Sequence, residues 1–143
     1  MPYRFLEDQF TADVGFVACG STLDECFAAA AEATLEVMLA NPQSLQACAR
    51  RAVHAESESL DLALLRFLEE LVYYKDTEQL LLRPAGVAVT PREGRWVVDG
   101  SLEGEPIDAN RHELCADVKA VTLHRLAVRQ TDSGWEATVV LDI

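Results

Sequence analysis

The sequence lacks the features that mark several large classes of protein. It has only four cysteines among 143 residues and no CxxC pair, so neither a zinc ribbon nor a disulfide framework is indicated. No apolar run approaches the about 20 residues that a membrane-spanning helix needs, and the first residues lack a signal-peptide pattern. We therefore expect a cytoplasmic protein that does not enter a membrane. We expect its thiols to be free and buried as small apolar groups; they are Cys19, Cys26, Cys48 and Cys115.

Positive charge is also scarce. Twelve Lys and Arg stand against 24 Asp and Glu, which gives a formal net charge of −12. Nucleic acids are bound largely through Lys and Arg that neutralise phosphates, so we expect no direct binding of nucleic acid. If the protein serves RNA chemistry, it should do so by touching a more basic protein. The alternative interpretation is that the acidic surface only provides solubility.

Common catalytic motifs are missing as well. The chain has no Gly-rich phosphate loop, no HExxH and no serine nucleophile elbow. Half of its residues are apolar and a quarter are charged, which is typical of a globular protein. The length suits one domain, and no linker or repeat divides it, so we predict a single domain over residues 1–143.

Two stretches have the apolar spacing of amphipathic helices. The first begins after a capping box over residues 22–25, in which Thr22 and Glu25 satisfy backbone amides of the first turn. It is expected to end at Asn41 and Pro42. The second follows Ser59 and continues to residue 76, with acidic residues at its start that suit the helix dipole.

The other apolar segments alternate with a period of two, as strands do. They are residues 14–19, 44–57, 80–82, 87–89, 96–98, 118–128 and 135–141, with turns at 91–94 and 132–134 and a loop over 103–117. Arg50 and Arg51 are expected to mark a bulge. Hairpins on this scale imply antiparallel pairing. We therefore predict an α+β fold: a two-layer domain with a mainly antiparallel sheet, covered on one face by two amphipathic helices.

Three carboxylates are candidates for a cation site. Asp142 and the α-carboxylate of Ile143 stand side by side where the last apolar strand ends, and Asp13 precedes the first strand. Neighbouring carboxylates repel one another unless a cation or donors lie between them. Hard oxygen ligands favour Ca²⁺ or Mg²⁺ over zinc. Taken singly, Asp13 can instead cap a turn and Asp142 can be a solvated end residue.

The densest group of functional side chains lies between residues 112 and 124. It contains His112, Glu113, Lys119 and His124, and strand alternation places Lys119 on the face opposite His124. A lone Lys in a strand is commonly a guard against edge pairing; the alternative is a contact with a partner or an anion.

These segments together resemble a known family. Residues 11–16 are similar to its His-Thr-Ala-Asp-Ile-Gly signature, and residues 60–76 resemble its second helix. Residues 118–122 with His124 resemble a Glu-Val-Lys-Ala-Thr-x-His block, and residues 140–143 match a fixed C-terminus. The family is the archeases, accessory proteins of the GTP-dependent tRNA-splicing RNA ligase.

The resemblance implies a function that composition does not. Archeases promote guanylylation and multiple turnover of the ligase and are not known as enzymes themselves. The family's cation, usually calcium, would be held here by Asp13, Asp142 and Ile143. Lys119 matches the lysine implicated in activating the ligase, and we place His112, Glu113 and His124 with it as candidate partner contacts. Phe10 stands where the family has histidine, which suggests a divergent, bacterial-type member acting in tRNA splicing or RNA repair.

Two other functional classes stay open at this point. One is a general chaperone-like binding module. The other is a small metal-dependent hydrolase, which needs a base near the cation. For that base the sequence offers His112, Glu113 and His124.

Overall fold

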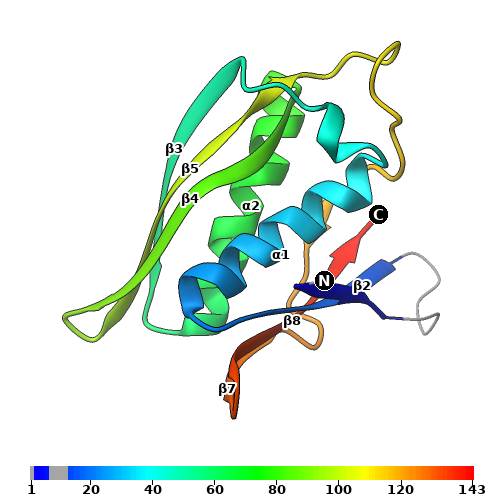
Figure 1. The fold of residues 1–143 in the computed structure, drawn as a ribbon. Coiled ribbons are helices and arrows are strands. Elements are labelled where there is room, and N and C mark those ends of the chain that lie inside the picture. Colours follow the sequence, from blue (N-terminus) through cyan, green and yellow to red (C-terminus); the bar gives the residue numbers. More distant parts are fainter. Residues whose placement is uncertain (1, 7–12) are drawn as a thin grey trace.

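In the computed structural model, which describes residues 2–6 and 13–143, the chain forms two antiparallel sheets and two α-helices (Figure 1). The first sheet contains β1 (Tyr3–Phe5), β2 (Asp13–Gly20), β6 (Ala120–Val121), β7 (Ala127–Thr131) and β8 (Gly134–Asp142). Its order is β1-β2-β8-β6, and β7 also pairs with β8. The second sheet has the order β3-β5-β4, formed by β3 (Ala49–Ser57), β4 (Leu80–Arg92) and β5 (Arg95–Pro106).

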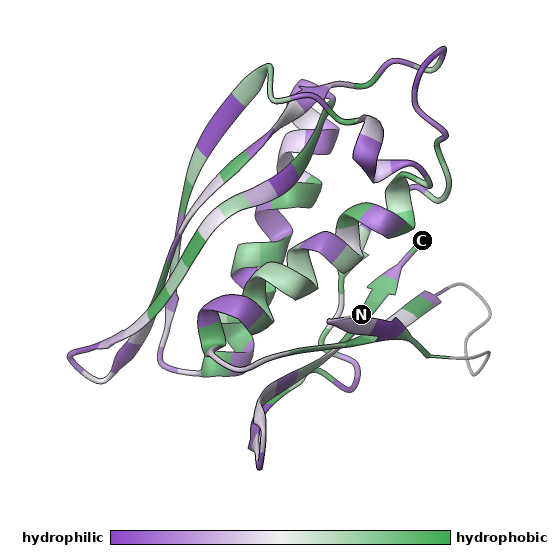
Figure 2. Ribbon diagram, in the orientation of Figure 1, coloured by the Kyte–Doolittle hydropathy of each residue, from purple (hydrophilic) through white to green (hydrophobic). Residues whose placement is uncertain are grey.

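The helices join the two sheets. Helix α1 (Leu23–Met38) packs against β2 of the first sheet and β4 of the second, and α2 (Leu60–Glu78) packs against β3, β4 and β6. Apolar residues recur along both helices and β8 in Figure 2, and the buried ones form one connected core. The predicted α+β fold is therefore confirmed, and its strands divide between two sheets. No described helix is both long and apolar enough to cross a membrane.

The helix starts agree with the sequence. The amide of Glu25 donates to Thr22 Oγ1 at 3.1 Å, while Glu25 Oε2 accepts from the amide of Ser21 at 2.9 Å. The capping box is thus confirmed, with its return bond one residue earlier than expected. Ser59 Oγ caps α2 by accepting from the amide of Leu62 at 3.3 Å.

Acidic side chains in the first turn of each helix also hold strands in place. Asp24 Oδ1 accepts from the backbone amide of Val89 in β4 at 2.8 Å, and Asp61 Oδ1 accepts from that of Val128 in β7 at 2.7 Å. Helix α1 is thereby bonded to the second sheet and α2 to the first. The acidic start of α2 predicted a favourable interaction with the helix dipole but not this bond to β7.

Several predicted boundaries were wrong. Strand β5 continues to Pro106, so the loop starts after that residue and not at 103. Gly104 permits this continuation, because a Cβ there would lie 1.8 Å from the carbonyl oxygen of Leu81 in β4. Strand β3 begins only at Ala49, after the 3-10 turn Pro42–Ser44.

The predicted bulge at Arg50 and Arg51 was also wrong. The pairing of β3 with β5 is continuous, and the irregularity lies in β4 between Pro84 and Gly86.

The long alternating strand predicted over residues 118–128 was wrong too. Only Ala120–Val121 pair with β8 before the chain turns. The turn follows from local bonding: the amide of His124 donates to Thr122 Oγ1 at 3.2 Å, and Arg125 takes a left-handed φ of 56°. Lys119 lies just before β6, and it and Ala120 are both exposed, where alternation predicted opposite faces.

All four cysteines are free, as predicted, but only Cys26 is buried; Cys19, Cys48 and Cys115 are exposed. Apolar neighbours in the sequence indicate a strand without indicating its buried face. Cys19 lies on the face of β2 shared with Glu136, and not on the core face. Burial raises the pKa of Cys26 to about 12.

Candidate functional site

Predicted site residues meet around the C-terminal end of β8. Asp13 of β2 is the direct cross-strand partner of Asp142, and Ala120 of β6 is its partner on the other side. The backbone N–H of Lys119 donates to the carbonyl oxygen of Asp142 at 2.8 Å. Two segments far from Asp142 in the sequence, one at Asp13 and one at Lys119 and Ala120, therefore meet it from opposite sides.

The two aspartates share one face of the sheet. Directly opposed residues in an antiparallel pair have Cβ atoms about 5 Å apart, so the carboxylates of Asp13 and Asp142 are close neighbours. Both residues are half-buried. In the part of the chain that the structure describes, no hydrogen bond or ion pair involves either carboxylate. Like charges placed directly opposite one another destabilise a sheet, and a bound cation would relieve this repulsion.

Ile143 fixes the end of β8 through its side chain. It is half-buried and packs against the core, directly after the fully buried Leu141 and the half-buried Asp142. Ile143 directly follows Asp142 in the sequence, so its backbone lies next to the aspartate pair. Among the described residues no group of three His, Cys, Asp or Glu side chains has the geometry of a metal site. A cation here would therefore depend on the two aspartates together with the α-carboxylate.

The segment before Lys119 is held by Lys75 of α2. The buried Lys75 Nζ donates to Asp117 Oδ1 and, at 2.7 Å, to the carbonyl oxygen of Val118. It also forms an ion pair with Asp76 at 2.7 Å. Burial alone would lower the pKa of Lys75, but its hydrogen bonds with the two aspartates outweigh this and raise that pKa. Lys75 is a residue that the sequence pattern did not single out, since its position lies within a predicted helix.

His112 is part of a buried network. Its side chain is fully buried, its Nδ1 accepts from the amide of Asp108 at 2.9 Å, and its Nε2 lies 3.4 Å from Glu105 Oε2. Glu105 is also bound by Arg111 and by the amide of Gln46. The sequence grouped His112 with Lys119 as a partner contact; the structure instead shows its imidazole holding the 107–119 loop, with no exposed surface to present.

The other residues of this group are on the surface. Glu113 and His124 are exposed, and so is Leu123, at 67%. The backbone of Glu113 is held against the end of α1, because its amide donates to Asn41 Oδ1 at 2.8 Å. Leu123 is an apolar group next to the site that the sequence did not single out. Phe10, the substituted signature residue, lies outside the described residues.

Comparisons with known proteins identify the family of this chain. The family model described as "Archease protein family (MTH1598/TM1083)" matches residues 3–143. The chain belongs to the archease family. Among curated archeases, that of Pyrococcus furiosus is 35% identical over 136 residues, covering 94% of this chain and 95% of its own length. That of Archaeoglobus fulgidus is 34% identical over 143 residues, covering 100% of both chains.

Solved structures share the fold. The solution structure of a Methanobacterium thermoautotrophicum protein superposes with a TM-score of 0.85 at 34% identity, covering 99% of both chains. A Thermotoga maritima protein, described as an archease and possible chaperone, has a TM-score of 0.61 at 14% identity over 96% of both chains. At that identity the second likeness supports the fold alone.

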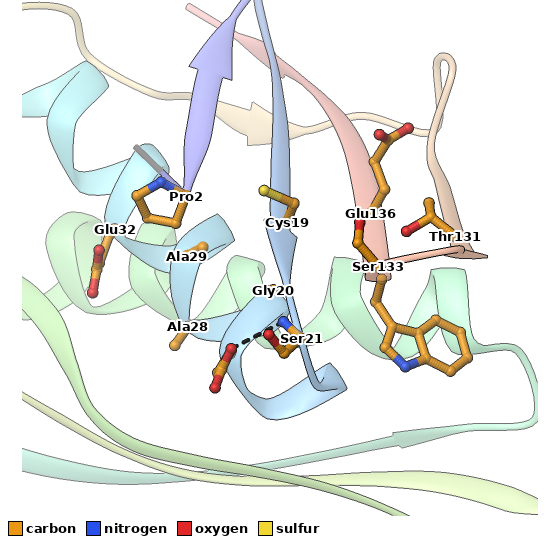
Figure 3. Close-up of a pocket in the computed structure, with 12 residues that line it drawn as sticks. Pro2, Cys19, Gly20, Ser21, Ala28, Ala29, Glu32, Thr131, Ser133 and Glu136 are labelled. Carbon is orange, nitrogen blue, oxygen red and sulfur yellow. Dashed lines mark hydrogen bonds between the residues drawn. The ribbon is translucent and has the colours of Figure 1, made fainter.

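A groove of about 680 Å³ lies at the end of the β2–β8 pair opposite to Asp13 and Asp142 in this archease-family chain (Figure 3). Cys19, Trp135 and Glu136 line it from the strands, and Glu25 lines it from α1. Two of its carboxylates already have partners, because Glu25 binds the amide of Ser21 and Glu136 pairs with Arg129. A third carboxylate of the groove, Glu32 of α1, has no hydrogen-bond or ion-pair partner among the described residues, and burial raises its pKa.

Proposed function

We propose that this protein is an accessory factor that activates a GTP-dependent RNA ligase, promoting guanylylation and repeated turnover in tRNA splicing or RNA repair. The observation that carries the proposal is the convergence on Asp142 in a member of the archease family: Asp13 lies on one side and the exposed Lys119 on the other. An accessory role requires no catalytic group of its own. It is also consistent with a formal net charge of −12, which disfavours direct binding of RNA.

In this proposal Asp13, Asp142 and the α-carboxylate of Ile143 bind one divalent cation, calcium in the first instance and magnesium as the alternative. Ca²⁺ accepts several oxygen ligands in flexible geometry, which suits two side chains from neighbouring strands and a main-chain carboxylate. The repulsion within the aspartate pair gives the fold a reason to bind such an ion. Calcium would supply positive charge at this end of the sheet.

The ligase-facing surface comprises Lys119, Leu123, Glu113 and His124. Lys119 provides a flexible cation, and Leu123 provides exposed apolar area of the kind that anchors protein interfaces. The bonds from Lys75 to Asp117 and Val118 hold this segment against α2, and the bond from the Lys119 amide to the Asp142 carbonyl holds it against β8. A basic ligase cleft would find carboxylates and a lysine within one compact surface.

The test is a ligation assay with the cognate ligase under limiting enzyme. Adding the protein should increase ligase guanylylation and the number of turnovers. Lys119→Met should abolish most of this gain, whereas Arg92→Met, which removes an exposed cation at the far end of β4, should retain it. If the wild-type protein leaves turnover unchanged with a verified cognate ligase, the proposal fails.

The cation has its own test. In a protein that ends at Ile143, one added glycine converts the α-carboxylate into an amide, so calcium affinity and ligase activation should both fall. Asp142→Ala should have the same two effects. Calcium-independent thermal stability in the wild type would reject the cation while leaving the ligase role open.

A chaperone-like module is the second candidate. Two exposed leucines near the site, Leu114 and Leu123, favour it. This function predicts suppression of aggregation of unrelated proteins at the doses that activate the ligase. A protective effect confined to the ligase would exclude it.

A further inference from the structure

Strand β3 has a free edge within the described sheet, where its neighbour is β5. Two carbonyls mark the direction of this edge: Glu56 O accepts from Arg66 Nη1 of α2 at 3.1 Å, and Arg50 O accepts from Arg51 Nη1 at 2.7 Å. In an antiparallel strand the N–H and C=O of one residue point to the same side, and alternate residues point to opposite sides. Ala52 and His54, which lie between Arg50 and Glu56, therefore present their backbone groups to the same free edge.

These groups are available for pairing. Among residues 2–6 and 13–143, no backbone or side-chain hydrogen bond engages the amide of Ala52 or His54 at this edge. The side chain of His54 bonds neighbouring carboxylates and leaves its own backbone groups unengaged, with Nδ1 2.6 Å from Asp99 Oδ1 and Nε2 2.8 Å from Glu56 Oε2. An incoming strand would thus meet an unpaired backbone.

An acidic groove of about 620 Å³ runs beside this edge. The strand contributes His54 and Glu56, and α2 contributes Arg66, Glu69, Glu70 and Tyr73. Glu69 and Glu70 have no ion-pair partner among the described residues. Burial, and secondarily the charge of Glu69, raises the pKa of Glu70. Tyr73 is 54% exposed, and its ring packs edge-to-face with that of Tyr74 at 5.2 Å between centroids.

We propose that the free edge of β3 binds an extended, basic segment of a partner protein as a fourth strand of the second sheet. Backbone hydrogen bonds to Ala52 and His54 would supply the pairing. Every second side chain of the segment would point toward α2, where Lys or Arg would meet Glu69 and Glu70 or lie over the Tyr73 ring. The charges along β3 would oppose indiscriminate pairing with apolar strands.

Charge favours a foreign basic segment over a second copy of this chain. Two copies paired through β3 would bring their α2 helices toward each other, and each helix carries the same unpaired Glu69 and Glu70. The formal net charge of −12 per chain adds to this repulsion. A basic segment instead neutralises the groove. This interaction is independent of the proposed ligase activation at the Asp142 end, which lies in the other sheet.

The direct test is an NMR titration of the ¹⁵N-labelled full-length protein with a capped Thr-Lys repeat peptide. A length of nine residues matches β3. We expect chemical-shift changes and slowed amide exchange at Ala52 and His54, and binding that weakens as salt rises. A Thr-Glu peptide should not bind. A Thr-Lys peptide N-methylated at alternate amides keeps its charge but should lose binding, because its edge-facing donors are blocked.

Variants divide the two contributions. Glu69→Gln with Glu70→Gln should weaken peptide binding about threefold to tenfold, whereas Asp132→Asn in the β7–β8 turn should leave it unchanged. Ala52→Pro removes an edge donor at a position where an edge strand tolerates proline and should abolish binding. The proposal is overturned if the chemical-shift changes map outside β3, or if the N-methylated peptide binds equally well. It is also overturned, in favour of a dimer, if the Ala52 shifts change with protein concentration in the absence of peptide.

Discussion

The opposed aspartates predict an unusual response to a single substitution. Asp13→Asn removes one of two like charges that face each other directly across β2 and β8. Without a cation, the variant should therefore be more stable than the wild type. With calcium present the order should reverse, because the variant has lost a ligand. A purely structural role for Asp13 would not produce this change of sign.

The size of the effect follows from the geometry. Side chains at Cβ atoms about 5 Å apart place their carboxylates roughly 6 Å from each other. At an effective dielectric constant between about 20 and 80, the repulsion is about 0.7–3 kcal/mol. For a chain of this length each kcal/mol corresponds to about 2–4 °C in Tm. Calcium at about 100 times its Kd adds about 2.7 kcal/mol to the wild type, or about 5–10 °C.

The assay is thermal unfolding of both proteins in EDTA and in calcium, with Asp132→Asn as a control for an equal charge change elsewhere. We expect the Tm of Asp13→Asn to exceed that of the wild type by a few degrees in EDTA and to respond little to calcium. A lower Tm in EDTA would show that the pair is not repulsive. An unchanged calcium response would show that Asp13 is not a ligand.

Three further substitutions test the fold around the two sites. Gly104→Ala should lower the free energy of unfolding, measured in urea, by about 3 kcal/mol or more, because its Cβ would overlap a backbone carbonyl of β4. The control Gly86→Ala should leave stability nearly unchanged, because a Cβ at that position meets open space. Hydrogen bonds to Asp99 and, second, to Glu56 raise the pKa of His54. The stabilisation that protonated His54 provides is therefore present below its ordinary pKa of about 6.5 and is lost as pH rises through the raised value. The difference in unfolding free energy between wild type and His54→Gln should shrink from about pH 6 to pH 9, and a constant difference would contradict this. Lys75→Met should lower the free energy of unfolding by about 1.5–3 kcal/mol, because the Val118 carbonyl loses its charged donor. It should also speed hydrogen exchange of the amides in the 107–119 loop. Lys75→Arg should restore part of the stability and part of the protection from exchange.

Sequence patterns were reliable where the cause is local. The capping residues Thr22 and Ser59 mark where the helices begin, because their hydroxyls bind amides only three residues away. The apolar stripes and the period-two segments identified the α+β class for the same reason. Local patterns failed at residues 118–128, where a hydroxyl–amide bond and a left-handed Arg125 interrupt a strand whose composition is otherwise suitable.

The candidate site was predictable only in part. Asp13, Lys119 and Asp142 were chosen from the sequence, but their meeting depends on β2 and β6 pairing with opposite sides of β8. His112 had the same sequence context as Lys119, yet it is buried, because Glu105 and the Asp108 amide provide partners inside the loop. Side-chain chemistry alone does not distinguish a buried structural histidine from an exposed one.

The amino-acid sequence by itself determined the acidic surface, the two helices with their caps and the antiparallel class. These properties arise from composition and from contacts within a few residues. The tertiary structure alone decided which strands share a sheet, which faces carry Cys19 and Lys119, and that β3 is an edge strand among the described residues. Those outcomes depend on packing between distant segments. Alternation along a strand indicates that one of its faces is buried, but which strand pairs with it depends on the core that the helices and both sheets form together.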